Sequence, residues 1–189
     1  MPCETVKSEC CVLMPREYAK LRDIMKPMYL IHCDALLHTG MRITEYEIFL
    51  RHLEWYKPSR RCIDLPKLAI RKKRTLYKER SVILSLKGCD AIQHLIDLNV
   101  KGMPTRQSFN AYLHDIADKS GLGDQNICEK MFRKTIISWL VSVFPEKQMY
   151  INHSAGHTRD VQLNDYLGVQ FRREDVEDMR VQLKGWGET

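Results

Sequence analysis

The sequence has no apolar run of the roughly 18–20 residues that a membrane-spanning helix requires. Its first residues, Met1-Pro2-Cys3-Glu4, lack the basic and apolar regions of a secretory signal peptide, so we expect a cytoplasmic protein. The seven cysteines form neither a C-x-x-C pair nor a Cys/His cluster with zinc-ligand spacing. We therefore expect no metal site, and we expect the cysteines to be reduced thiols, several of them buried.

Length and composition indicate one ordinary folded domain. The chain has 189 residues, of which 44% are hydrophobic and 29% charged, enough to bury a sizeable core. Internal repeats, low-complexity tracts and long linkers are all missing, and this composition excludes collagen-like and disordered chains.

The positive charge is concentrated in one segment. The formal net charge is +6, but the window from Lys57 to Arg80 alone holds ten basic and two acidic residues, which leaves −2 for the rest of the chain. Such a patch favours a polyanion, because each neutralised phosphate releases condensed counterions. A solvated basic loop with no partner explains the charge equally well, so the charge alone does not decide.

The spacing of apolar residues predicts a mostly helical domain. A capping box, Thr44-x-x-Glu47, is expected to start the third helix, and Asp90 is expected to cap the fourth. The strand-like segments Arg61–Leu65 and Ser81–Ser85 flank the basic residues and predict a hairpin whose turn carries Arg71 to Lys78. The helices are expected at Pro15–Met25, Tyr29–Leu37, from Thr44, Ala91–Leu98, Pro104–Lys119, Met131–Phe144, Thr158–Leu167 and Glu174–Leu183. The fold class is therefore mainly α with a small antiparallel β-sheet (α+β).

Four candidate functional residues are individually weak signals. Arg42 precedes a capped helix, and Arg133 lies in the most apolar helix, where a structural ion pair is the default explanation. His157 could simply begin a helix, and Tyr166 could belong to the core. Their order along the chain is more informative. A T-G-M-R-I-T-E segment at 39–45 precedes the basic hairpin, and Arg133, then Gly156-His157, then Tyr166 follow it.

In this combination the sequence resembles the tyrosine recombinases, the phage-integrase family. Residues 39–45 match the first-arginine motif T-G-[LM]-R-I-[ST]-E, and Gly156, His157 and Tyr166 keep the register of the last motif. The segments Lys130–Leu140 and Tyr166–Gly187 look closest to the integrases of archaeal viruses and plasmids. The usual H-x-x-R box reads K-x-x-R here, with Lys130 in the place of the histidine.

The resemblance covers roughly Leu13 to Gly187 and implies the fold of a tyrosine recombinase catalytic domain. Residues 13–189 would form that domain behind a tail of residues 1–12. The separate helical DNA-clamp domain that usually precedes it is not recognisable in this chain, which is either part of a longer protein or a minimal form.

The resemblance also implies the chemistry, which is site-specific DNA cleavage and rejoining through a 3′-phosphotyrosyl intermediate. Tyr166 would be the nucleophile, and the guanidinium groups of Arg42 and Arg133 would clamp the scissile phosphate. His157 would donate to the same phosphate or help to move the tyrosine proton. Because fixed cations neutralise the phosphate and the phosphotyrosine bond conserves energy, no metal, ATP or other cofactor is expected.

The basic hairpin would supply the remaining groups. Lys73 is the candidate that protonates the leaving 5′-oxygen, with Lys72 and Lys78 as rivals. Lys130 would add a phosphate contact, and Glu45 is expected to orient a neighbour in the site rather than touch DNA. The residues expected to bind DNA along the hairpin are Arg71, Lys72, Arg74 and Lys78.

The expected partners are double-stranded DNA with att-type sites and further copies of the chain. Family resemblance implies a tetramer on DNA and a monomer free in solution. Two alternatives remain open from the sequence. One is a catalytic-domain relic or truncated product that binds att DNA without cutting it, and the other is a type IB topoisomerase-like nicking-closing enzyme.

Overall fold

The computed structural model describes residues 5–7, 10–69, 79–123, 125–156 and 171–188. The described part is mainly helical with a small antiparallel sheet, so the predicted fold class is confirmed. Its longer helices are α1 Pro15–Ile24, α2 Pro27–Thr39, α3 Ile43–Phe49, α4 Leu86–Asp97, α5 Arg106–Lys119, α6 Lys130–Val143, α7 Gln148–Ala155 and α9 Arg173–Gln182.

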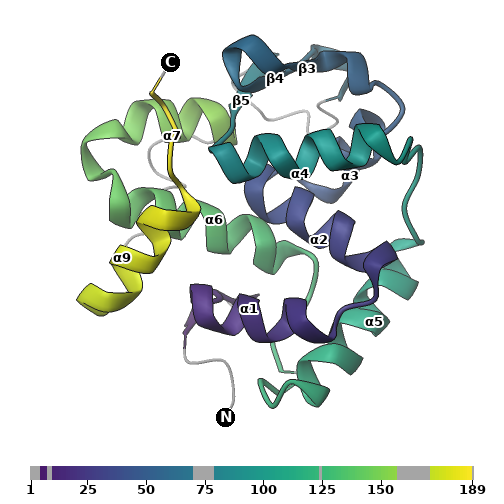
Figure 1. Cartoon of the computed structure of the whole chain (residues 1–189), viewed down its shortest axis with the longest axis vertical. Coiled ribbons are helices and arrows are strands. Elements are labelled where there is room, and N and C mark those ends of the chain that lie inside the picture. The colour runs from purple at the N-terminus through teal and green to yellow at the C-terminus, as the bar shows by residue number, and fades with distance from the viewer. Residues whose placement is uncertain (1–4, 8–9, 70–78, 124, 157–170, 189) are drawn as a thin grey trace.

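The helices α2 and α6 form the centre of the fold. The helix α2 packs against both α4 and α6, while α9 and α7 pack on α6 from the other side (Figure 1). A helix surrounded in this way needs apolar residues on most of its surface. This explains why α6 buries almost every residue between Met131 and Val143, Trp139 completely.

The sheet predicted around the basic segment is present. Strands β4 Cys62–Leu65 and β5 Arg80–Ile83 are antiparallel, and Leu65 pairs with Arg80 at the end of the ladder. A third short strand, β3 Tyr56–Lys57, pairs with the other edge of β4 and was not expected. The expected turn from Arg71 to Lys78 lies outside the described residues.

Several local expectations were wrong. A second two-stranded sheet, β1 Val6–Lys7 with β2 Cys10–Cys11, and the helix α7 were not predicted. The helix expected at Thr158–Leu167 lies outside the described residues.

Two helix caps also differ from those expected. The Glu45 carboxylate, rather than that of Glu47, accepts the backbone N–H at the start of α3, and the Ser85 hydroxyl rather than Asp90 caps α4, which begins earlier than expected.

The segment before α1 is bound along α6. The backbone N–H of Leu13 donates to the Thr135 hydroxyl at 2.9 Å, and the Trp139 indole N–H donates to the Leu13 carbonyl at 2.9 Å. Because both backbone polar groups of Leu13 have a partner, these hydrogen bonds offset the cost of burying them. It therefore fixes one face of the helix that carries Arg133.

Most described cysteines are free thiols, as expected. Cys11 is disulfide-bonded, however, so the expectation of reduced thiols is wrong at that position. The free thiols are Cys10, Cys33, Cys62, Cys89 and Cys128.

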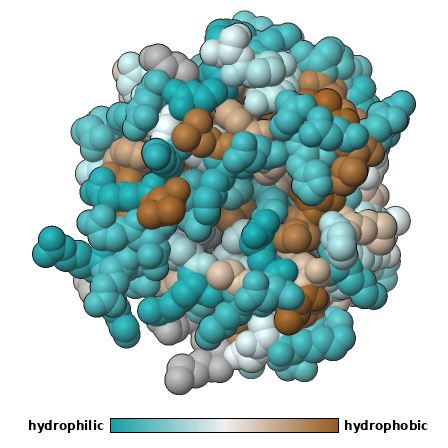
Figure 2. Space-filling view, in the orientation of Figure 1, coloured by the Kyte–Doolittle hydropathy of each residue, from teal (hydrophilic) through white to brown (hydrophobic). Residues whose placement is uncertain are grey.

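The visible surface is mainly hydrophilic. In Figure 2 the apolar side chains form separate patches rather than one continuous area. Among the described residues, no helix combines the length and apolar character needed to cross a bilayer.

Candidate functional site

The first part of the site is the turn between α2 and α3. Gly40 ends α2 in the left-handed conformation, with a φ of +59°. A Cβ atom at this position would lie 2.9 Å from Ile136 Cγ2 on α6, so only glycine allows α2 and α6 to approach this closely. The turn therefore places Arg42, the residue just before α3, beside α6.

Arg133 joins two segments through their backbones. Its Nη1 donates to the Gly40 carbonyl and its Nη2 to the Ala155 carbonyl, both at 2.5 Å. The guanidinium is buried, and these charge-assisted bonds offset part of the cost of removing its charge from water. Arg133 thus brings the Arg42 turn and the end of α7 to one place.

A buried carboxylate links two further arginines. Glu45 Oε1 accepts a hydrogen bond from Arg42 Nη1 at 2.8 Å, and Glu45 Oε2 accepts one from Arg80 Nη2 at 2.8 Å. The Glu45 and Arg80 side chains are only 2% and 1% exposed, whereas Arg42 is 25% exposed. Of these three side chains, only Arg42 is substantially open to a ligand.

The charges of the clustered arginines shift the pKa values of both Glu45 and Arg80. Burial alone would raise the pKa of Glu45, but the charges of Arg80, Arg133 and Arg42 outweigh it and hold that pKa below its usual value. Burial, together with the nearby charges of Arg133 and Arg42, lowers the pKa of Arg80 to about 10 against the opposing effect of Glu45. Three guanidinium groups around one carboxylate leave two positive charges, which suits an anion.

The predicted residues are brought together only in part. Arg42 and Arg133 converge on the cluster that also holds Glu45. Lys130 is exposed at the start of α6, one turn before Arg133, and within the described chain it makes no hydrogen bond or ion pair with the cluster. The other predicted site residues, Arg71, Lys72, Lys73, Arg74, Lys78, His157 and Tyr166, lie outside the described residues.

The sequence interpretation missed Arg80 as a member of the site. It was counted only as one of ten basic residues in a charged segment. Its signal was the alternation of β5, in which Arg80 and Val82 are buried and Ser81 and Ile83 are half-buried. Because side chains two apart in a strand share a face, Arg80 lies on the core-facing side.

No group of three or more His, Cys, Asp or Glu side chains in the described ranges is arranged to hold a metal ion. A hollow of about 360 Å³ lies between α1, α2, α4 and the end of α9, and none of the three clustered arginines lines it. The cluster itself is therefore the candidate site.

Comparison with solved structures identifies the fold, whereas comparison of the sequence with known families and proteins finds no match. No protein-family model matches the sequence, and no curated protein matches it either. The crystal structure of XerA recombinase matches 96% of this chain with a TM-score of 0.62 and 15% identity. The chain has the fold of a tyrosine recombinase catalytic domain.

Further solved structures share this fold. The Tn1549 transposon integrase, solved in complex with circular intermediate DNA, matches 89% of the chain with a TM-score of 0.62 and 15% identity. The integrase from mycobacterium phage Brujita matches 93% with a TM-score of 0.53 and 10% identity. The chain spans 66% of the XerA and Tn1549 proteins and 65% of the Brujita integrase. The finer resemblance to archaeal virus and plasmid integrases stays a prediction.

Proposed function

We propose that this chain is the catalytic part, residues 13–189, of a site-specific DNA recombinase that cleaves and rejoins strands through a 3′-phosphotyrosyl intermediate. The observation that supports this most strongly is the convergence of Arg42 and Arg133, 91 positions apart in the sequence, beside one buried carboxylate within a tyrosine recombinase fold. A guanidinium stays charged at any working pH and can offer paired donors to a phosphate.

In the proposed reaction the Tyr166 oxygen attacks the scissile phosphorus, and the bond from phosphorus to the 5′-oxygen breaks. Arg42 and Arg133 stabilise the charge that gathers on the non-bridging oxygens. Lys73 gives its proton to the leaving 5′-oxygen, and His157 contacts the phosphate or takes part in moving the tyrosine proton. Attack by a 5′-hydroxyl on the phosphotyrosine then reverses these steps and restores the DNA backbone.

Arg133 fits this role because it is held before substrate arrives. Two backbone carbonyls, of Gly40 and Ala155, fix its guanidinium plane. Donors that are already oriented need no reorganisation when the transition state forms. Arg42 is oriented by Glu45 and remains partly exposed, so its guanidinium is open to a phosphate.

The proposed partners follow from the same scheme. Arg71, Lys72, Arg74 and Lys78 contact the DNA backbone near the cleavage site, and Lys130 adds a further contact. Double-stranded DNA carrying att-type sites is the substrate, and four copies assemble on it from free monomers in the host cytoplasm. The Tn1549 integrase was itself solved with DNA, which supports DNA as the partner class.

The test is the capture of a covalent adduct. A library of nicked duplexes with a randomised centre is incubated with the protein, and DNA that stays attached in detergent is sequenced. We expect adduct from the wild type, none from Tyr166→Phe with DNA binding unchanged, and wild-type levels from Tyr150→Phe, whose side chain is on the exposed surface of α7.

Three outcomes contradict the proposal or redirect it. Adduct from Tyr166→Phe would show that the nucleophile is wrong. Tight, salt-sensitive binding without adduct on any duplex would favour the DNA-binding relic. Relaxation of supercoiled plasmid without site preference would favour the topoisomerase-like enzyme.

A further inference from the structure

Arg80 is a buried charge with two unused donors. Its side chain is 1% exposed and leaves the last rung of the β4–β5 ladder, opposite Leu65. Its Nη2 donates to Glu45 Oε2, whereas Nε and Nη1 are buried without a hydrogen-bond partner anywhere in the described chain. A buried guanidinium with unsatisfied N–H groups is costly, so stability alone does not explain why arginine occupies this position.

Glu45 connects Arg80 to Arg42. Its two oxygens are shared, since Oε1 accepts from Arg42 Nη1 and Oε2 accepts from both Arg80 Nη2 and the Arg42 backbone N–H at 2.9 Å. The carboxylate can therefore hold the partly exposed Arg42 in one orientation only if its own position is fixed. Arg80 is the group that contacts Glu45 from the interior.

We propose that Arg80 is a positioning residue that fixes the Glu45 carboxylate and, through it, aims the Arg42 guanidinium at the anion that occupies this site. The identification of that anion as a DNA phosphodiester rests on the proposed function, whereas the orientation of Arg42 does not. Arg80 also adds the positive charge that the anion offsets, although its own buried nitrogens do not reach solvent.

The same side chain fixes the residue that precedes His157. A Cβ atom on Gly156 would lie 3.0 Å from both Cδ and Nε of Arg80. Arg80 therefore passes between Glu45 on one side and the backbone at the end of α7 on the other. A side chain in this place can hold the two parts of the site at a fixed separation.

The test observes Arg42 directly. In the full chain, the Nε–H resonance of the Arg42 side chain is identified by its loss in Arg42→Lys, and its order is measured by ¹⁵N relaxation. We expect an ordered guanidinium in the wild type and a mobile one in Arg80→Met and in Glu45→Gln. Arg80→Lys, which keeps the charge, should restore part of the order, and the exposed Arg173→Met should change nothing.

A double-mutant cycle on the rate of DNA cleavage supplies the second readout. On a nicked duplex that forms adduct, Arg80→Met should slow cleavage about 10–100-fold, by analogy with the loss of residues that orient metal ligands, with DNA affinity nearly unchanged. In a Glu45→Gln background, Arg80→Met should slow cleavage little further, because both substitutions disrupt the same contact between Arg80 and Glu45.

The two proposals fail in distinguishable ways. An unchanged Arg42 resonance in folded Arg80→Met overturns the role of Arg80, whatever the activity of the protein. If Arg80→Met does not fold, a fully ordered Arg42 in Glu45→Gln overturns it instead. Absence of adduct from the wild type contradicts the proposed function, and the relaxation of Arg42 still decides whether Arg80 positions it.

Discussion

The sulfur atoms of Cys10 and Cys128 lie 3.9 Å apart, although the two residues are 118 positions apart in the sequence. Cys10 is buried in β2, and Cys128 is half-buried two residues before α6. A hydrogen bond from the Cys10 thiol, together with the backbone N–H of Lys130, lowers the pKa of Cys128 to about 6 despite partial burial. These contacts therefore favour the thiolate form of Cys128.

We expect Cys128 to be alkylated faster than the other free thiols, because the thiolate is the nucleophilic form. Iodoacetamide labelling followed by peptide mass spectrometry would show a rate that falls as the pH drops below about 6. In Cys10→Ala the donor is lost, so the midpoint should move up towards roughly 8.5, the value of a free cysteine. An identical pH profile in the two proteins would contradict the hydrogen bond.

Gly156→Ala tests the close contact at the end of α7. Gly156 has a φ of +66°, and its added Cβ would meet the Arg80 side chain at 3.0 Å. The left-handed conformation alone should cost about 1–2 kcal/mol in the free energy of unfolding. Urea unfolding measures this loss, and Gly187→Ala is a matched control because Gly187 has the same φ of +66° and a Cβ there would lie no closer than 3.5 Å to Lys147. Equal effects at both glycines would argue against the contact.

Acid should destabilise the protein through His38. Burial lowers its pKa to about 4, whereas an unfolded histidine titrates near 6.5. Since the unfolded state then binds more protons, the stability that His38 confers is complete above pH 6.5 and is lost as the pH falls towards 4. The shift corresponds to at most about 3 kcal/mol.

The measurement is the free energy of unfolding in urea across this pH range. His38→Leu should flatten the dependence by removing one contribution, while the buried His32, whose pKa burial also lowers to about 4, keeps the rest. The exposed His94→Gln should leave the curve unchanged. A His38→Leu curve as steep as that of the wild type would show that another group is responsible.

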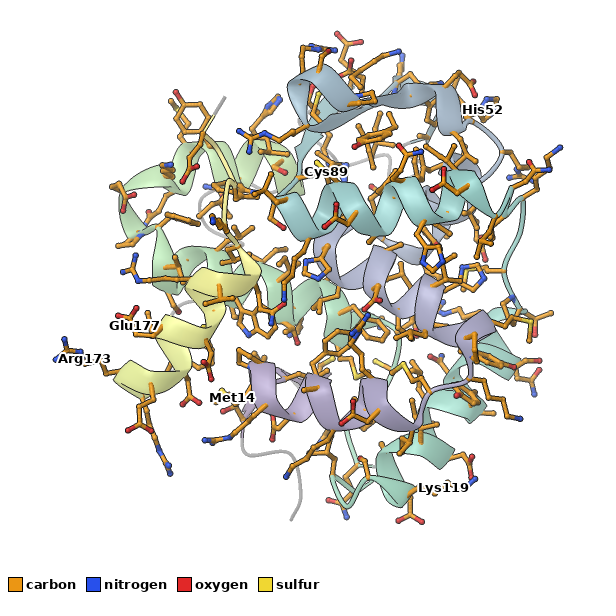
Figure 3. All side chains as sticks on the ribbon, in the orientation of Figure 1. Met14, His52, Cys89, Lys119, Arg173 and Glu177 are labelled. Carbon is orange, nitrogen blue, oxygen red and sulfur yellow. The ribbon has the colours of Figure 1, made fainter. Side chains whose placement is uncertain are left out.

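Arg133→Lys keeps the charge but cannot bridge two carbonyls in one plane. The buried oxygens of Gly40 and Ala155 would lose a donor, which should cost about 1–3 kcal/mol of stability. If the proposed reaction is right, the rate of cleavage should fall about 10²–10³-fold, as it does in other enzymes that lose one preorganised hydrogen-bond donor. Arg173→Lys on α9, whose side chain points away from the fold in Figure 3, is the control for both assays. Wild-type cleavage by Arg133→Lys would exclude a role in phosphate binding.

The sequence predicted the parts of the fold that depend on long apolar patterns. The periodicity of α6 and the strand pair around the basic segment were recognisable because burial on one or both faces leaves a regular pattern. The helix α7 was not, since Gln148–Ala155 is short, its apolar residues Met149 and Tyr150 are exposed, and two of its three buried positions hold the small side chains of Ser154 and Ala155.

For the site, Glu45 was expected to orient a neighbour rather than touch DNA; its hydrogen bond to Arg42 is present, and the orienting role stays a prediction. The partnership with Arg80 could not be predicted, because it joins residues 35 positions apart and depends on how β5 meets the start of α3. The cap of α3 was misassigned for a related reason. Glu45 and Glu47 are both plausible in sequence, and only the structure shows which carboxylate turns back to the helix start.

The two backbone partners of Arg133 have a consequence for how this architecture tolerates substitution. A main-chain oxygen is the same chemical group whatever side chain its residue carries, so mutations at position 155 can accumulate without removing the acceptor. The acceptor at position 155 is thereby independent of the side chain there, whereas Gly40 stays restricted by its φ and by its contact with Ile136. An arrangement of this kind can persist while most of the surrounding sequence drifts, and fold comparison then remains informative after sequence comparison has lost its signal.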